Sequence, residues 1–240
     1  MITRISALAL GALLTLGACA DPELATKVTE LEAKLDGLEK QVASGGGAAA
    51  PAGASLEDGA RDAFKAIQGK VAELDFDSAK TLCKGAMSKF GRTKAAQRQG
   101  RICDEVAVVG KDAMDLDVDK WFQGEAKLAD SGATLLVFWE QWCPHCKREV
   151  PEIEATYNKY KGRMNVVGLT KVNRSATDEK VEAFIKEKAV TYPMGKEKDG
   201  SLSQYYNVSG VPAAALVKDG KIVWRGHPAR LKGDALDKLL

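Results

Sequence analysis

"FWEQWCPHCKRE", residues 138–149, places two cysteines two residues apart directly after an apolar run. That run, "TLLVFW" at 134–139, is typical of a buried strand, and the residues from Pro144 onward show helical spacing. Because proline suits the first position of a helix, we expect Cys143 to lie where a strand ends and a helix begins. The unpaired N–H groups of that helix and the positive end of its dipole would then favour a thiolate at this cysteine.

The two cysteines suit disulfide exchange, in which a thiolate is the nucleophile. Cys146 follows Cys143 by about one helical turn, so it can resolve a mixed disulfide formed on Cys143. His145 would add a hydrogen-bond donor or a positive charge near the thiolate, and a stabilised thiolate makes a dithiol pair more oxidising.

Two other uses of these cysteines are open at this point. A structural zinc site needs four ligands, and the chain offers this CxxC and two histidines, His145 and His227, without a second paired motif. A structural disulfide within a CxxC closes a short, strained and labile ring. We therefore expect a redox dithiol, and no metal or other cofactor.

From about Met114 to Leu240 the sequence resembles the thioredoxin superfamily. Trp139 and Trp142 fall at the spacing of that family's "FWxxWC" signature, and Pro151 stands where the family has a helix-kinking proline. "GVPA" at 210–213 matches the loop before the family's last hairpin. The resemblance implies an α/β fold, a thioredoxin-like domain with a central mixed sheet flanked by helices.

The resemblance also implies roles for individual residues. Pro212 is carried over as the family's cis-proline, with Val211 before it, in a loop that lies beside the dithiol and pairs with an extended substrate peptide. Trp142 and Pro144 flank the attacking cysteine within the same signature.

Within the superfamily the sequence looks most like the membrane-tethered TlpA/ResA branch, whereas its CPHC motif resembles the oxidising DsbA type. These two resemblances imply opposite redox directions. One position departs from the family: Val137 stands six residues before the first cysteine, where thioredoxin and DsbA patterns have a buried acid. Glu140 is the nearest replacement as proton acceptor for Cys146; the alternative is that Glu140 is a solvated surface carboxylate.

The N-terminal residues 1–18 resemble a secretory signal peptide, because an early arginine precedes an apolar run that ends in small residues. "LGAC" at 16–19 resembles the lipobox of bacterial lipoproteins, which implies that Cys19 is acylated and begins the mature protein. An ordinary cleavage site beside Cys19 is the alternative. The lipobox implies a periplasmic protein anchored to a membrane by lipid, and Ala20 in place of aspartate favours the outer membrane over the inner one.

Residues 19–43 are expected to form the lipidated N-terminus and a coiled-coil stalk. Between Leu24 and Val42 apolar residues recur at alternating intervals of four and three, and the flanking lysines and glutamates attract each other in a parallel arrangement. This predicts a parallel homo-oligomer, a dimer or a trimer; a lone amphipathic helix is the alternative for so short a repeat. Residues 44–55 are rich in Gly, Ala, Ser and Pro, and we expect a flexible linker there.

Residues 56–112 show helical spacing, so we expect a small region of two to four helices. Cys83 and Cys103 fall on separate predicted helices, at 78–90 and 94–110. Once Cys19 is assigned to lipid and the CxxC to redox chemistry, these two are left as a pair in a compartment where disulfides persist. A disulfide closing about twenty residues would stabilise this region by roughly 3 kcal/mol. Two buried thiols are the alternative.

Residues 113–240 are expected to form the thioredoxin-like domain. Thr177 is the predicted N-cap of one helix, and Asp219 and Gly220 mark a hairpin turn. The expected strands lie at 134–139 and 164–170 and in a hairpin at 212–226, and the expected helices lie at 144–162, 177–189, 199–207 and 230–240.

Charge argues against a nucleic-acid partner, because 35 Lys and Arg are interleaved with 33 Asp and Glu for a net charge of +2. We expect an enzyme: an extracytoplasmic, lipid-anchored thiol-disulfide oxidoreductase that exchanges disulfides with cysteine-containing exported proteins. A membrane thiol-disulfide partner would recharge it. The alternatives are a disulfide isomerase on an oligomeric stalk and a non-catalytic, partner-binding lipoprotein.

Overall fold

The computed structural model describes residues 52–128 and 132–240. The predicted signal peptide, the lipobox with Cys19, the heptad segment and most of the predicted linker lie outside the described residues. Within the described ranges, no helix combines the length and the apolar character that crossing a membrane requires.

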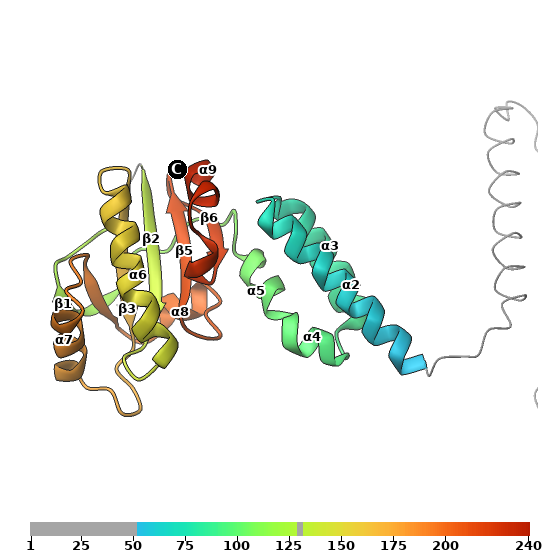
Figure 1. Ribbon diagram of the computed structural model, residues 1–240, viewed down its shortest axis with the longest axis horizontal. Coiled ribbons are helices and arrows are strands. Elements are labelled where there is room, and N and C mark those ends of the chain that lie inside the picture. Colours follow the sequence, from blue (N-terminus) through green and yellow to red (C-terminus); the bar gives the residue numbers. More distant parts are fainter. Residues whose placement is uncertain (1–51, 129–131) are drawn as a thin grey trace, which may run out of the picture. The chain divides into compact units, whose positions relative to one another are not determined.

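Within residues 52–128, four helices precede the sheet, which agrees with the two to four expected at 56–112 (Figure 1). The Asp75 side chain begins one of them by accepting a hydrogen bond from the Ser78 backbone, and Thr93 begins another in the same way through Ala96. The helices are α2 (Ala52–Ala72), α3 (Phe76–Phe90), α4 (Lys94–Gln99) and α5 (Arg101–Ala107).

Two boundaries in this region differ from the prediction. α2 begins at Ala52, so the last four residues of the predicted linker, 52–55, are helical. The single helix predicted at 94–110 is instead two short helices that meet at Gly100. The chain turns so tightly there that a Cβ on Gly100 would lie 2.5 Å from the Ala96 carbonyl oxygen, which only glycine avoids.

A disulfide joins two of these helices. Cys83 on α3 and Cys103 on α5 are bonded, with their Cα atoms 5.4 Å apart. The expected staple is confirmed, and the alternative of two buried thiols is wrong. Around the bond lies a core of its own, made of Phe64, Ile67, Ala79, Ala86, Ala96, Ile102 and Val106.

The rest of the described chain is built on a mixed six-stranded sheet in the order β1-β4-β3-β2-β5-β6, which confirms the expected α/β thioredoxin-like fold. β2, β3 and β4 run parallel to one another, whereas β1, β5 and β6 pair antiparallel with their neighbours. The strands are β1 (Val118–Gln123), β2 (Ala133–Trp139), β3 (Met164–Thr170), β4 (Met194–Glu197), β5 (Ala213–Lys218) and β6 (Lys221–Gly226).

The sequence reasoning missed β1 and β4. β4 has only four residues, "MGKE", and β1, "VDKWFQ", is an edge strand whose residues are mostly half-buried. Neither strand shows the period-two alternation or the continuous apolar run that identifies a strand from sequence. The all-buried β2 carries that run and is where it was expected.

Helices cover both faces of the sheet. α6 (Pro144–Tyr160), α7 (Asp178–Glu187) and α9 (Asp234–Leu239) share one buried cluster with the sheet, and α6 lies across its front in Figure 1. α8 (Ser201–Tyr205) packs in a second cluster with the alternate residues of β2 and β3, on the opposite face.

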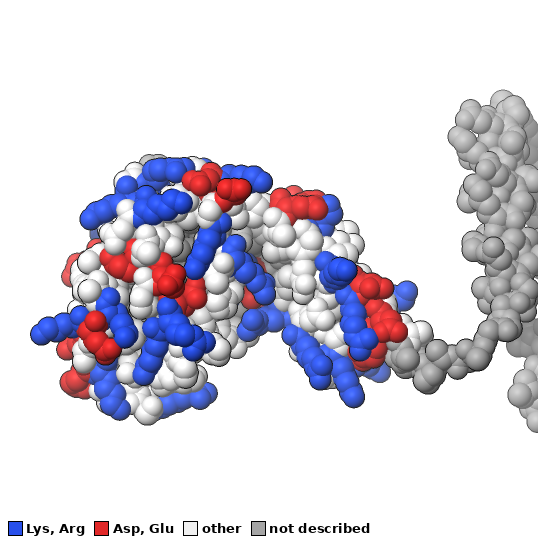
Figure 2. Space-filling model, in the orientation of Figure 1, with Lys and Arg blue, Asp and Glu red and all other residues white. Residues whose placement is uncertain are grey.

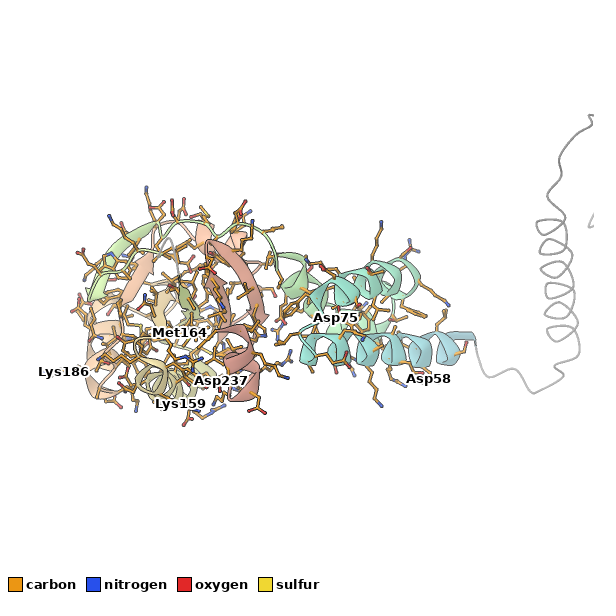
Figure 3. The ribbon with its side chains drawn as sticks, turned by 90° about the horizontal axis from the view of Figure 1, so that it is seen from above. Asp58, Asp75, Lys159, Met164, Lys186 and Asp237 are labelled. Carbon is orange, nitrogen blue, oxygen red and sulfur yellow. A yellow bond between two sulfur atoms is a disulfide. The ribbon has the colours of Figure 1, made fainter. Side chains whose placement is uncertain are left out.

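Local signals account for the ends of these helices. The Thr177 hydroxyl accepts a hydrogen bond from the Lys180 backbone and so confirms the predicted cap of α7. The last helix begins only at Asp234, because Pro228–Arg230 form a separate 3-10 turn, so the prediction of a helix from residue 230 was too long. The far end of α6 is tied to α9, since the Tyr160 hydroxyl donates to Asp237 at 3.2 Å. Figure 3 labels Asp237 on α9 and Lys159 in the last turn of α6.

Candidate active site

Cys143 lies at the N-cap of α6, where the strand-to-helix connection was expected. The Cys146 backbone N–H donates a hydrogen bond to the Cys143 sulfur at 3.4 Å, and Pro144 occupies the first turn. Both cysteines are free thiols; Cys143 is 4% exposed and Cys146 is fully buried. The helix thus presents one sulfur toward the surface and holds the other behind it.

The loop before β5 lies against this sulfur. The Val211–Pro212 peptide bond is cis, as the resemblance implied. The Cys143 thiol donates to the Val211 carbonyl oxygen at 3.7 Å, which places the backbone of this loop beside the dithiol. A substrate chain that pairs with the loop would therefore pass directly over Cys143.

The environment of Cys146 favours its protonated form. Burial raises the pKa of the Cys146 thiol far above its ordinary value, and the interaction with Cys143 raises it further. A buried, protonated thiol is a poor first nucleophile. This agrees with the expectation that Cys143 attacks and Cys146 resolves.

Val137, which stands where the related patterns have a buried acid, is fully buried in β2. Glu140 is also buried, at 7% exposure, so the alternative of a solvated surface carboxylate is wrong. Desolvation raises the pKa of Glu140, and hydrogen bonds from Trp142 and Asn173 oppose that shift. Within the described chain no hydrogen bond joins its carboxylate to Cys146, so its role as proton acceptor stays a prediction.

His145 does not contact either sulfur by a hydrogen bond in the described part of the chain. Its ring is exposed, and Nδ1 lies 2.7 Å from the guanidinium of Arg148. Because arginine only donates, Nδ1 is the acceptor in this pair. The expected hydrogen bond from His145 to the Cys143 sulfur is therefore not formed in this geometry, and the expected effect of a positive charge on His145 stays a prediction.

Trp142 joins the dithiol loop to the segment after β3. Its indole N–H lies 3.0 Å from the Asn173 side-chain oxygen and 3.2 Å from the Glu140 carboxylate. The Arg174 guanidinium stacks over its ring, 4.1 Å from the centroid. Arg174 has a φ of 55°, a left-handed conformation that is uncommon for arginine and concentrates at functional sites.

A cavity of about 500 Å³ opens beside Cys143. Glu140, Lys171 and Glu197 line it from the carboxyl ends of β2, β3 and β4, three parallel strands that meet at one edge of the sheet. Glu197 is buried and accepts two hydrogen bonds from Ser203, one at 2.6 Å from the hydroxyl and one at 2.9 Å from the backbone.

The sequence reasoning missed five of these residues: Lys171, Asn173, Arg174, Glu197 and Ser203. Lys171 and Asn173 directly follow a strand that was predicted, so their position after it was a usable signal. Glu197 ends a strand that was not predicted, and no pattern links Ser203 to the site.

Glu149 was missed as well. It lies on α6 three residues after Cys146, and its Oε1 is buried without a hydrogen-bond partner in the described ranges. An unpaired buried carboxylate oxygen is costly, so such a residue is a functional candidate. Its spacing from Cys146, just under one helical turn, was visible in the sequence.

Comparison with known proteins agrees with this site. Residues 109–225 match the model of the AhpC/TSA family. Sporulation thiol-disulfide oxidoreductase A of Bacillus subtilis is 31% identical over 87 residues, which cover 36% of this chain and about half, 53%, of that protein. The solved structure of StoA from Bacillus subtilis gives a TM-score of 0.41 at 26% identity, covering 48% of this chain and 86% of that one.

The thiol-disulfide oxidoreductase ResA of Bacillus thuringiensis strain Al Hakam is 30% identical over 129 residues, which cover 52% of this chain and 73% of ResA. Residues 109–225, which match the family model, include the dithiol, the cis-proline loop and nearly all of the sheet. This chain therefore belongs to the thioredoxin-like AhpC/TSA family, as a distant relative of the ResA thiol-disulfide oxidoreductases and an enzyme of their kind.

Proposed function

We propose that this protein is an extracytoplasmic, lipid-anchored thiol-disulfide oxidoreductase that exchanges disulfides with cysteine-containing exported proteins. The observation that carries the chemistry is the geometry at the start of α6. Cys143 lines the cavity beside the Val211 carbonyl, and the buried Cys146 lies behind it. An attacking thiol, a resolving thiol and a backbone edge for a peptide therefore occupy one place.

The exchange balances in two steps. The Cys143 thiolate attacks a substrate disulfide, forms a mixed disulfide and releases one substrate thiolate, which takes up a proton. Cys146 then loses its proton, attacks the Cys143 sulfur and releases the second substrate thiolate. The substrate gains two electrons and the enzyme dithiol becomes a disulfide; the reverse sequence oxidises a substrate dithiol.

The N-terminal sequence supports a location of this protein outside the cytoplasm. The signal-peptide pattern and the lipobox at Cys19 support a periplasmic protein held by lipid at a membrane, with Ala20 favouring the outer one. Each exchange converts the dithiol to a disulfide, or the disulfide to a dithiol, so a thiol-disulfide partner in the membrane has to restore the starting redox state.

The heptad segment supports assembly into a parallel dimer or trimer. A monomer in sedimentation experiments on the mature protein would contradict that assembly.

Replacing the cysteines one at a time tests the exchange. The Cys143→Ser variant should lose insulin reduction, because it lacks the attacking sulfur. The Cys146→Ser variant should accumulate mixed disulfides through Cys143, visible as reducible adducts on non-reducing gels. A non-catalytic, partner-binding lipoprotein would form no such adducts, and unchanged insulin reduction by Cys143→Ser would contradict the assignment.

The direction of exchange separates a reductase from an oxidase or isomerase. The CPHC motif and the predicted oligomeric stalk favour an isomerase, whereas the likeness to ResA favours the general oxidoreductase assignment. The reduction potential of the Cys143/Cys146 pair against glutathione decides between them. A value of about −120 mV supports oxidase or isomerase, and a value of about −270 mV supports reductase.

A further inference from the structure

A second cavity, of about 470 Å³, lies next to the dithiol, between the first turns of α6 and the face of α7. Lys147 and Arg148 line it from α6, Lys180 lines it from α7 and Lys188 from the position just after α7, and Glu187 is the one acid among its lining residues. Figure 2 shows Lys and Arg side chains interleaved with Asp and Glu side chains over this face of the molecule.

The two cavities are linked by one contact. Arg148 lines the second cavity and bonds the ring of His145, which lines the cavity of Cys143. On the other side of the Cys143 cavity, Lys171 and Arg174 add two more cations. We call the five cations Lys147, Arg148, Lys171, Arg174 and Lys180 the basic rim.

The cations of the basic rim form no close ion pair within the described residues, although the charge of Lys171 acts on Glu140 and the charge of Lys147 acts on Glu187. In residues 52–128 and 132–240, no carboxylate oxygen lies within 4.0 Å of any of its five cationic groups. Glu187 pairs with Lys188 at 2.7 Å instead. Lys180 donates to the Ser175 carbonyl oxygen at 2.6 Å, which fixes its position without cancelling its charge.

The acids of the dithiol cavity face inward. Glu140 and Glu197 are 7% and 5% exposed, and each is held by hydrogen bonds, Glu140 to Trp142 and Asn173 and Glu197 to Ser203. Because these two acids are held by their own hydrogen bonds, the basic rim remains available to an incoming partner. Unpaired cations around a cleft attract an oppositely charged partner and speed its approach.

We propose that the basic rim binds an acidic segment of the substrate protein next to its reactive cysteine. The proposal rests on the proposed function and names the class of substrate. Two of the rim cations, Lys171 and Arg174, line the cavity of Cys143, and the other three line the cavity at the start of α6. A partner bound to the rim therefore lies close enough to bring its own sulfur to Cys143. An anionic membrane surface bound there would instead cover Cys143, which disfavours lipid as the occupant.

Synthetic peptides test this with the full-length reduced protein. Three peptides carry the same cysteine as a mixed disulfide with mercaptoethanol, flanked by glutamates, by lysines or by serines and glycines. The tryptophan fluorescence of the enzyme follows the exchange in stopped flow. The acidic peptide should react on the order of tenfold faster than the basic one. The difference should shrink as ionic strength rises from about 0.01 M to about 0.15 M, where the screening length falls from about 30 Å to about 8 Å.

Charge reversal gives the matched comparison. The Lys147→Glu/Arg148→Glu/Lys180→Glu variant should prefer the basic peptide. The Lys65→Glu/Lys84→Glu variant, which changes two exposed lysines of α2 and α3, should keep the preference of the unmodified protein. The salt dependence needs no substitution, so it tests the proposal even if the triple variant fails to fold.

The outcomes separate the two levels of inference. Exchange with all three peptides at equal rates and without salt dependence would overturn the basic rim and leave the proposed function standing. The same result together with binding to phosphatidylglycerol vesicles would assign the rim to a membrane and also overturn the proposal. Exchange with none of the peptides would overturn the proposed function and this inference with it.

Discussion

The difference between the two thiols is set by burial at the scale of single residues. Cys143 lines the cavity and bonds the cis-proline loop, whereas Cys146 is fully enclosed and its pKa is raised by that enclosure. Two cysteines with the same chemistry thus acquire separate roles from their surroundings. Glu140 is another residue whose chemistry is set by its surroundings. Its position after the end of β2 suggests a solvated carboxylate, but burial removes water from the carboxylate and raises its pKa.

The raised pKa of Cys146 predicts a pH dependence of stability for the reduced protein. An unfolded cysteine ionises above about pH 8.5, whereas the folded Cys146 keeps its proton to a higher pH. The folded state therefore binds the proton more tightly, and its contribution to stability, present below pH 8.5, is lost as the pH rises. We expect the unfolding free energy to fall by up to about 1.4 kcal/mol per pH unit from this group.

Urea titrations at several pH values under reducing conditions measure this slope, with the Cys146→Ser variant as control. That variant has no ionising group at the position and should show a shallower decline above pH 8.5. Equal slopes in both proteins would show that Cys146 is not held protonated by the fold.

At the scale of elements, one short connection builds the site. β2 ends, the chain turns, and α6 starts with its first N–H groups around Cys143, so strand and helix together fix the sulfur. The disulfide between α3 and α5 works differently, because it joins two helices of a small region with a core of its own. Such a region has little apolar area to bury and gains most from a covalent link.

The Cys83→Ser/Cys103→Ser variant should therefore lower the unfolding free energy of the helical region by about 3 kcal/mol. Limited proteolysis and urea unfolding followed by circular dichroism measure the loss. Dithiothreitol serves as control: it should bring the unmodified protein down to the variant and leave the variant unchanged. Equal stability of the two oxidised proteins would show that the bond adds nothing to this region.

At the scale of the whole molecule, charge and position act together. The net charge of +2 is too small to suggest any charged partner, yet two cations line the cavity of Cys143 and three more line the cavity at the start of α6, with no close ion pair among the described residues. The predicted lipobox, outside the described residues, would confine this charged opening to a membrane-bound protein in the periplasm.

The Cys19→Ser variant tests that confinement. Without acylation at residue 19 the protein lacks the paired acyl chains that anchor it stably to a membrane. It should therefore move from the membrane fraction to the soluble periplasmic fraction. Fractionation followed by immunoblotting measures the shift, and insulin reduction by the released protein controls for folding. Membrane association that persists in this variant would contradict the lipid anchor.

Local patterns in the sequence determined the strand-CxxC-helix connection, the cap at Thr177 and the pairing of Cys83 with Cys103, because each depends on neighbouring residues or on a short list of candidates. The cis-proline loop was implied by the family resemblance of "GVPA" at 210–213. Tertiary structure alone decided that Glu140 is buried, that Asn173 and Arg174 hold Trp142, and that α6 and α7 share a basic cavity. Those contacts depend on strand order and register, which bring together residues far apart in the chain, and local periodicity carries no information about either.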